Sequence, residues 1–328
     1  MVAIAQIIDQ FDDPVIVLEG SRILEANPAA RDLLGEAIVG RDVRLAIRQP
    51  QALAAILSRQ AQDLELAGIG GIERPWTMAV RPITGAKLLV RFRDRGEAVA
   101  AERMRVDFVA NASHELRTPL ATIGGFAETL ADDDVPADLR RKFAGTIGSE
   151  AARMLRIIED LMSLSRIEAD RFRQPRERID LVDLARQAVE QIAPLAERRQ
   201  CRIIFEPSDR SVSVKGDRAQ LLQALDNLLS NAIRYGWKEG GAVTLTVGNE
   251  HGRPFLRVTD EGRGIAGEHI SRITERFYRV DNARSRDSGG TGLGLAIVKH
   301  IAERHRGELT IRSAVGQGTS VALTFPAT

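Results

Sequence analysis

The chain has very little cysteine, since Cys201 is the only one among its 328 residues. A single thiol excludes an intrachain disulfide and any metal site built from several cysteines. Because Cys201 adjoins the apolar run Ile203–Phe205, we expect it to be a buried structural thiol. A chain without disulfides suits a reducing compartment, so we expect it in the cytoplasm.

Long apolar runs are also missing. A membrane-spanning helix needs roughly 18 or more consecutive apolar residues. The longest uncharged run covers the sixteen residues 313–328 and alternates as a strand does. The first residues lack the basic region and apolar stretch of a signal peptide. We therefore expect no membrane span in this chain, although a preceding segment could attach the protein to a membrane.

Neither sign of charge is in excess. Lys plus Arg is 46 and Asp plus Glu is 45, a formal net charge of +1. A general nucleic-acid-binding protein would show a basic surplus, so we expect no direct binding of nucleic acid. The hydrophobic share of 44% argues against a disordered chain, and the length predicts two or three domains.

The hydrophobic pattern changes twice along the chain and predicts three domains, 1–95, 96–170 and 171–328. The first contains short strand-like runs, a turn at 19–21 and a helix opened by Asn27-Pro28, as in a small α+β module. The second carries apolar residues three and four apart in two long stretches. In the third, helices are expected at 181–196, 217–235 and 294–306 and strands at 242–247, 255–260, 308–313 and 320–325.

These patterns place the chain in the α+β multidomain class. The two long helices would form a hairpin around a turn at 132–136, each with one apolar stripe. Two copies would cover both stripes in a four-helix bundle, so we expect a homodimer. The third domain would be an antiparallel-rich sheet covered on one face by helices, a two-layer α/β sandwich.

The octapeptide 113–120 carries the first candidate for chemistry. On a helix, His114 and Thr118 are four residues apart and share a face. Pro119 cannot donate its backbone hydrogen bond and crowds the carbonyl of Glu115, which predicts a bend or loosened turn beside His114. A neutral imidazole is nucleophilic. A His-Glu pair alone, however, is more often a solvated helix face.

Three segments further along suit a nucleotide. Asn227, Asn231 and Arg234 share one helical face, where amides and a guanidinium can hold phosphate oxygens and a magnesium ion. Asp260 ends a predicted strand and can accept from an exocyclic amine, while nearby glycines let a base approach the backbone. The loop 289–294 opens a helix and exposes backbone N–H groups. Each fragment alone is weak, and the loop is neither a Walker A nor a Rossmann motif.

Together these segments resemble the sensor histidine kinases. Residues 113–120 resemble their H box, 226–235 the N box, 260–265 the G1 box, 275–279 the F box and 289–298 the G2 box. The resemblance implies a Bergerat-type (GHKL) ATP-binding domain using ATP and Mg²⁺. An Asn at 227, where gyrase-like ATPases have a catalytic Glu, favours transfer to a protein histidine over hydrolysis.

The resemblance also implies roles for individual residues. His114 would be phosphorylated, Glu115 would act as acid and base, and Thr118 would position water when the site works as a phosphatase. Asn231 would ligate Mg²⁺ and Asp260 would recognise adenine. Further nucleotide contacts are expected from Asn227, Arg234, Tyr235, Gly262, Gly264, Ile265, Arg276, Arg279, Gly290, Thr291, Gly292, Leu293 and Gly294. The basic cluster before the glycine loop, which also contains Arg272, Arg284 and Arg286, would face the triphosphate.

Two further resemblances narrow the interpretation. Residues 25–35 are similar to a PAS sensor module. Thr274, in the stretch 273–281, stands where many histidine kinases have Phe, and this stretch resembles phosphate-regulon (PhoR-type) sensors. Gly236-Trp237 replaces the usual Thr-Pro after Tyr235. We thus expect a kinase that phosphorylates His114, passes the group to an aspartate of a response-regulator receiver domain, responds to phosphate and also dephosphorylates that partner. The alternatives are a non-catalytic ATP-binding scaffold and a GHKL-type ATP hydrolase.

Overall fold

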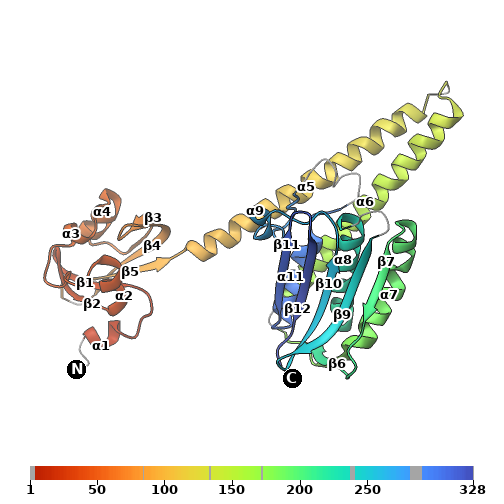
Figure 1. Cartoon of the computed structure of the whole chain (residues 1–328). Coiled ribbons are helices and arrows are strands. Elements are labelled where there is room, and N and C mark those ends of the chain that lie inside the picture. Colours follow the sequence, from red (N-terminus) through yellow and green to blue (C-terminus); the bar gives the residue numbers. More distant parts are fainter. Residues whose placement is uncertain are drawn as a thin grey trace. The chain divides into compact units, whose positions relative to one another are not determined.

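The structure is a computed structural model that describes residues 4–83, 85–132, 134–170, 173–236, 241–280 and 290–327. It divides into two compact units, Met1–Val109 and Ala110–Thr328, whose elements are labelled in Figure 1. Among the described helices, none has both the length and the hydropathy needed to cross a membrane.

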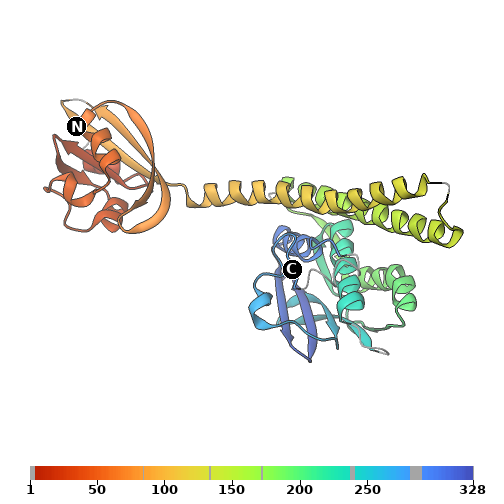
Figure 2. The same ribbon diagram turned by 90° about the horizontal axis from the view of Figure 1, so that it is seen from above.

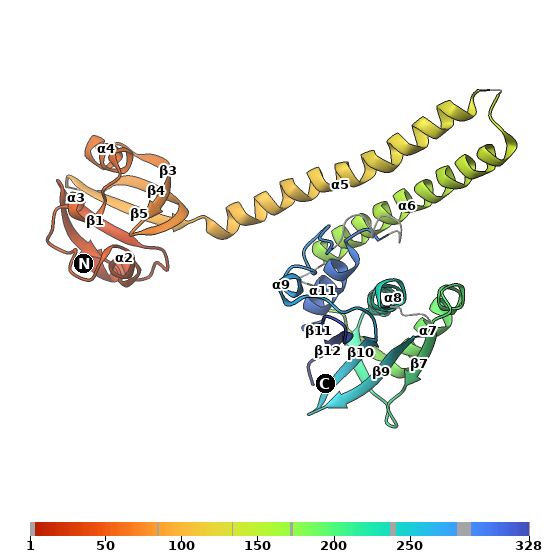
Figure 3. The ribbon, with the colours of Figure 1, turned by 45° about the horizontal axis from the view of Figure 1, so that its top comes forward.

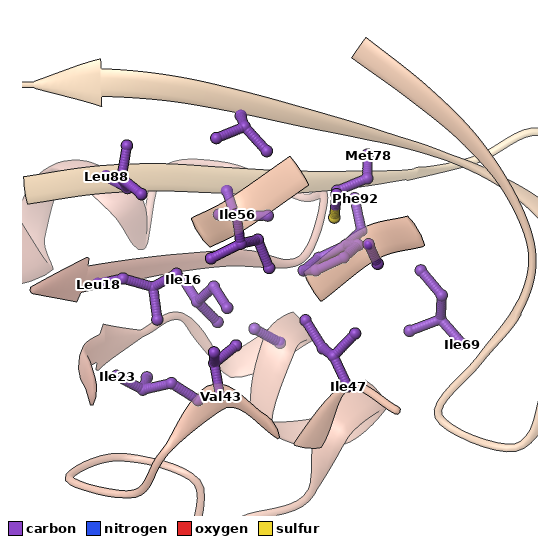
Figure 4. Close-up of a cluster of buried hydrophobic side chains, with 14 of the residues drawn as sticks. Ile16, Leu18, Ile23, Val43, Ile47, Ile56, Ile69, Met78, Leu88 and Phe92 are labelled. Carbon is purple, nitrogen blue, oxygen red and sulfur yellow. The ribbon is translucent and has the colours of Figure 1, made fainter. Parts of the chain in front are cut away.

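The first unit is a five-stranded antiparallel sheet with short helices. The strand order is β2-β1-β5-β4-β3. Its elements are α1 (Ile4–Ile8), β1 (Val15–Glu19), β2 (Arg22–Ala26), α2 (Pro28–Leu34), α3 (Val43–Ala46), α4 (Pro50–Ser58), β3 (Gln62–Ile69), β4 (Ile72–Ile83) and β5 (Lys87–Asp94). The expected strands and the helix after Asn27 are present, whereas α3, α4 and β3 were not expected. Figure 4 shows the apolar side chains that fill the core between the sheet and the helices.

Asn27 holds the start of this unit together. Its side-chain oxygen accepts the N–H of Val15 at 2.9 Å and caps α2 by accepting the N–H of Ala30 at 3.0 Å. Its amide nitrogen donates to the carbonyls of Phe11 and Asp13 at 3.0 and 2.9 Å. A buried amide is stable only when its donors and acceptors are paired in this way. These hydrogen bonds explain why an Asn precedes Pro28 at the start of α2.

Two long helices follow, α5 (Gly96–Leu130) and α6 (Ala137–Ala169). In the second unit they lie side by side as the expected hairpin (Figure 2), and the rings of Phe126 and Phe143 stack with centroids 4.8 Å apart. Helix α5 runs unbroken through Pro119, so the loosened turn expected beside His114 does not interrupt it. The hydroxyl of Thr118 donates to the carbonyl of His114 at 3.3 Å, a local bond that a helix tolerates.

The rest of the second unit is the expected two-layer sandwich. A mixed sheet of order β11-β12-β10-β9-β7 has one parallel pair, β7 with β9, and helices α7, α8 and α11 cover one face (Figure 3). The elements are β6 (Glu177–Asp180), α7 (Leu181–Arg198), β7 (Arg202–Glu206), β8 (Ser213–Gly216), α8 (Arg218–Tyr235), β9 (Ala242–Glu250), β10 (Arg253–Asp260), α9 (Gly267–Ile270), α11 (Gly294–Arg304), β11 (Glu308–Ala314) and β12 (Gly318–Thr324).

Helices α7, α8 and α11 and strands β9, β10, β11 and β12 lie where the hydrophobic pattern placed them, within a few residues, whereas the short helix α9 was not expected. Strands β6, β7 and β8 were not expected, because they are too short to show a period. Cys201 is buried just before β7, which confirms the expectation of a structural thiol. Burial raises its pKa, as is usual for an unreactive cysteine.

Candidate functional site

A cavity of about 480 Å³ lies in the second unit, bounded by α8, the end of β10, the glycine loop before α11 and one stretch of α6. It brings together segments that are far apart in the sequence. Most of the residues expected to contact nucleotide line this cavity. They are Asn227, Asn231, Arg234, Tyr235, Asp260, Gly264, Ile265, Arg279, Gly290, Thr291, Gly292 and Gly294. The size suits a drug-sized ligand.

Helix α8 presents its polar stripe to this cavity. Asp217 caps the helix by accepting the N–H of Gln220 at 3.2 Å. Leucines and alanines bury one face against the sheet, which leaves Asn227, Asn231 and Arg234 half-buried at the cavity wall. Burial lowers the pKa of the Arg234 guanidinium, since desolvation disfavours the charged form.

Asp260 ends β10 and is 8% exposed. One of its oxygens, Oδ1, accepts the N–H of Gly262 at 2.9 Å and that of Thr319 at 3.2 Å. Burial raises the pKa of Asp260 although these two hydrogen bonds act in the opposite direction. A buried carboxylate with one oxygen engaged and the other available is suited to accept a ligand's N–H.

Two glycines make this corner possible. A Cβ built on Gly236 would lie 2.2 Å from Cγ of Asp260, and one built on Gly262 would lie 2.3 Å from Cα of Gly236. A Thr at position 236, the usual residue there, would therefore clash with Asp260 in this backbone conformation. Trp237 lies outside the described residues. Gly262 itself does not line the cavity; it supports Asp260 through its N–H.

The glycine loop forms another part of the cavity wall. Gly292 has a φ of +74°, a conformation that favours glycine. A Cβ on Gly290 would lie 2.1 Å from the hydroxyl oxygen of Tyr235. The Thr291 hydroxyl accepts the N–H of Leu293 at 3.2 Å and donates to Asp160 of α6 at 2.6 Å. Leu293 is fully buried in the core and does not line the cavity.

Residues from α6 complete the wall, and the sequence analysis missed them. Arg156, Glu159 and Asp160 line the cavity although they belong to the helical hairpin. Burial raises the pKa of Asp160 in spite of the hydrogen bond donated by Thr291. Nearby, Ser163 donates to Gln223 of α8 at 2.7 Å. The helical period marked this stretch as core-forming, and no local motif pointed to a role in a cavity.

The residues of the H box lie beside this cavity but do not line it. His114 and Thr118 are exposed on α5, and Glu115 is half-buried. The carboxylate of Glu115 accepts from Arg279, which lines the cavity, at 3.1 Å and from Arg153 of α6 at 2.9 Å. Arg279 therefore connects the helix that carries His114 to the cavity wall.

Arg276 is placed away from the cavity. It pairs with Glu168 of α6, and its Nη2 lies 3.5 Å from Nε2 of His300 on α11. It thus joins the loop after α9 to the hairpin. Of the basic cluster expected to face a triphosphate, Arg284 and Arg286 lie outside the described residues, as does Gly289 of the glycine loop.

Three protein families match separate parts of the chain. Residues 216–328 match the histidine kinase-, DNA gyrase B- and HSP90-like ATPase family. Residues 104–170 match the His Kinase A (phospho-acceptor) domain, and residues 4–65 match the PAS domain. The first range contains α8 and the glycine loop, the second contains the part of α5 that carries His114, and the third contains β1, β2 and the helices of the first unit.

Individual proteins give the same result. The chain is 36% identical over 242 residues to sensor histidine kinase WalK of Bacillus subtilis, covering 73% of this chain and 39% of WalK. It is 39% identical over 239 residues to phosphate regulon sensor protein PhoR of Pseudomonas aeruginosa, covering 72% of this chain and 53% of PhoR. The chain thus spans about half the length of these relatives or less.

Among solved structures, one of histidine kinase ThkA in complex with the response regulator TrrA is similar to this chain. The match covers 98% of this chain and 98% of the matched chain. The TM-score is 0.55 and the sequence identity 22%, so this likeness concerns the fold. The cavity geometry, the three domain matches and the relatives agree with the sequence motifs. The chain belongs to the sensor histidine kinases.

Proposed function

We propose that the chain is an ATP-dependent protein-histidine kinase that phosphorylates His114. The observation that carries the proposal is the link between cavity and acceptor helix: Arg279 lines the cavity and binds Glu115, the neighbour of His114. Phosphoryl transfer depends mainly on positioning and charge neutralisation. A cavity that shares a residue contact with the acceptor helix supports both requirements.

The chemistry at His114 follows from an exposed imidazole beside a carboxylate. One ring nitrogen attacks the γ-phosphorus of ATP, the bond to the bridging oxygen breaks, and ADP leaves with the electron pair. The proton on the other ring nitrogen then passes to the Glu115 carboxylate as general base. Both residues lie on α5 within the second unit, and the solvent exposure of His114 leaves the ring open to a phosphoryl donor.

The cavity residues would divide the nucleotide between them. Asp260 would accept from the exocyclic amine of adenine, with Tyr235, Gly264 and Ile265 around the base. Arg234, Arg279 and the N–H groups of the loop 290–294 would approach the phosphates. Three of the expected residues would not touch the nucleotide. Gly262 would orient Asp260 through its N–H, Leu293 would anchor the glycine loop in the hydrophobic core, and Arg276 would tie its loop to Glu168 of the hairpin.

A magnesium ion fits the donor set of this cavity. Among the described residues no group of three or more His, Cys, Asp or Glu could hold a metal by itself. The Asn227 and Asn231 side chains line the wall, and an amide oxygen is a ligand that Mg²⁺ accepts along with water and phosphate oxygens. We propose that Asn231 holds the ion together with the nucleotide, where the ion would neutralise charge on the phosphates.

We also propose that the chain works as a homodimer. On α6, Leu155, Ile158 and Met162 form an exposed apolar stripe, while Ile157 and Leu164 on the opposite side are buried. An exposed apolar stripe of this kind marks an interaction site. Pairing two hairpins in a four-helix bundle would cover it.

The partner that receives the phosphoryl group would be an aspartate on a response-regulator receiver domain. ThkA, which shares the fold, was crystallised with a response regulator. Thr118 is exposed one turn after His114, where it could position water for dephosphorylating that partner. A Thr118→Ala variant should keep autophosphorylation and lose the dephosphorylation of the phosphorylated regulator.

Three finer assignments remain proposals. The likeness to PhoR and the stretch 273–281 support a phosphate-responsive sensor, which predicts that deleting the gene alters the induction of phosphate-scavenging genes at low phosphate. The domain limits 1–95, 96–170 and 171–328 agree with the start of α5 and the end of α6. The proposal that the protein lies in the cytoplasm is supported by its single cysteine, which excludes intrachain disulfides and suits a reducing compartment.

The central test uses ATP labelled at the γ-phosphate. We expect acid-labile, alkali-stable label on the purified chain and none on the His114→Gln variant. Tight ATP binding without label would instead indicate a scaffold. Rapid release of free phosphate without a labelled protein would indicate a hydrolase. Either result would overturn the kinase assignment.

A further inference from the structure

Glu115 is held by a second arginine that no sequence motif marks. Arg153 lies on α6 and is 6% exposed. Its Nη2 donates to Oε2 of Glu115 at 2.9 Å, and its Nη1 lies 3.6 Å from Oε2 of Glu150. Burying a guanidinium is costly unless it is paired, so this placement requires the carboxylates around it.

The other arginine on Glu115 has competing partners. Arg279 donates to the same carboxylate oxygen at 3.1 Å and also to the carbonyl of Gly290 in the glycine loop. It lines the cavity, where it would meet the phosphates of bound ATP. An anion of high charge would compete with Glu115 for this guanidinium. Arg153 belongs to the hairpin and does not line the cavity, so it could stay bound to Glu115 when ATP binds.

We propose that Arg153 is a positioning residue for Glu115. It would hold the carboxylate in one orientation while Arg279 turns to the nucleotide. The carboxylate could then take the imidazole proton as the N–P bond forms on His114. Glu150, three residues before Arg153 on the same helix, would keep the guanidinium in place. The inference rests on the proposed kinase function and assigns Arg153 no contact with ATP.

The experiment measures autophosphorylation rate constants and nucleotide affinity separately. We expect Arg153→Met to lower the rate constant at saturating ATP by about 10- to 100-fold, less than the roughly 10²- to 10⁴-fold that a general base contributes, because Glu115 itself is still present. The Kd for a fluorescent ATP analogue should change less than about twofold, because Arg153 does not line the cavity. Arg153→Lys keeps the charge but not the planar fork and should recover part of the rate. Arg166→Met, an exposed arginine on the same helix, is the matched control.

A double variant separates positioning from general damage to the fold. If Arg153 acts through Glu115, adding Arg153→Met to Glu115→Gln should cause no further loss of rate. An equal loss in both backgrounds would overturn the proposal, as would an unchanged rate in Arg153→Met. Because removing one partner of a buried ion pair destabilises a protein, Arg153→Met with Glu150→Gln provides a second variant. Its thermal unfolding should be checked against the wild type before rates are compared.

The two proposals fail in different ways. If the wild-type chain takes no label, or if label survives in His114→Gln, the kinase assignment fails and the role of Arg153 fails with it. If the wild type is labelled on His114 and the two losses add, only the role of Arg153 fails.

Discussion

Asp260 allows a test in which folding and binding separate. Its Oδ1 accepts both backbone hydrogen bonds, and an Asn at this position could keep them with its own oxygen. The other side-chain atom would become an NH₂ donor and face the amine that the carboxylate oxygen would have accepted. We expect Asp260→Asn to fold and to lose at least about 30-fold in ATP affinity, roughly 2 kcal/mol, measured by titration calorimetry.

The stability of this variant has a definite sign. Because burial raises the pKa of Asp260, the protonated carboxyl contributes stability that is present in full below its unfolded pKa and is lost as the pH rises through the folded pKa. At pH 7 the ionised group therefore costs stability that a neutral amide does not. Denaturant unfolding at pH 7 should show Asp260→Asn no less stable than the wild type. A large loss of stability would contradict this.

Gly236 is the second residue whose replacement should disturb the site. A Cβ there would lie 2.2 Å from Cγ of Asp260, so the carboxylate would have to move. We expect Gly236→Ala to destabilise the protein by about 1–3 kcal/mol and to weaken ATP binding. Gly267→Ala is the control, because a Cβ at Gly267 meets nothing within 4 Å. Equal effects of the two changes would show that the close approach at Gly236 is relieved by backbone movement.

At the scale of elements, the sequence predicts what is periodic or local. The spacing of Asn227, Asn231 and Arg234 places them on one face of a helix, and the structure has them on one wall of the cavity. Arg153 and Asp160 could not be found this way, since their partners lie on elements distant in the chain. Strands β6, β7 and β8 and helix α3 span only four or five residues, too few to show a hydrophobic period. Helix α4 is nine residues long and was missed.

The connection between α11 and α8 predicts a pH dependence. His305 follows α11, accepts the N–H of Asp217 through Nε2 at 2.9 Å and lies with Nδ1 2.7 Å from the carbonyl of Ile301. These contacts require a neutral ring with the proton on Nδ1, and burial lowers the pKa of His305. The unfolded chain therefore binds the proton more readily. This contribution to stability is present in full above an unfolded pKa of about 6.5 and is lost as the pH falls toward the lower folded pKa.

The measurement compares urea unfolding of wild type and His305→Gln between pH 5 and 8. We expect the variant to be less stable at pH 8 by about 1–3 kcal/mol, since a buried hydrogen-bond network is broken. The difference between the two proteins should shrink toward pH 5. His251→Gln, an exposed position, should follow the wild type at every pH. A difference that stays constant with pH would show that His305 does not change its protonation on unfolding.

At the scale of the whole molecule, the second unit contains both the acceptor helix and the cavity. Asp160, Arg156 and Glu159 of the hairpin line the cavity together with α8 and the glycine loop of the same chain. The cavity thus already forms within a single chain. We therefore expect one chain to bind nucleotide by itself, whereas a four-helix bundle needs two chains.

This difference makes the dimer testable without losing the binding site. We expect Leu155→Glu with Met162→Glu to convert the dimer to a monomer in sedimentation velocity, because two charges would enter the apolar stripe, where burying a charge is costly. The affinity for an ATP analogue should stay within about twofold of the wild type, since both residues lie outside the cavity wall. Val315→Glu, at a position 72% exposed beyond β11, is the control and should remain dimeric. A double variant that still sediments as a dimer would place the interface on another surface, and the apolar stripe of α6 would need another partner.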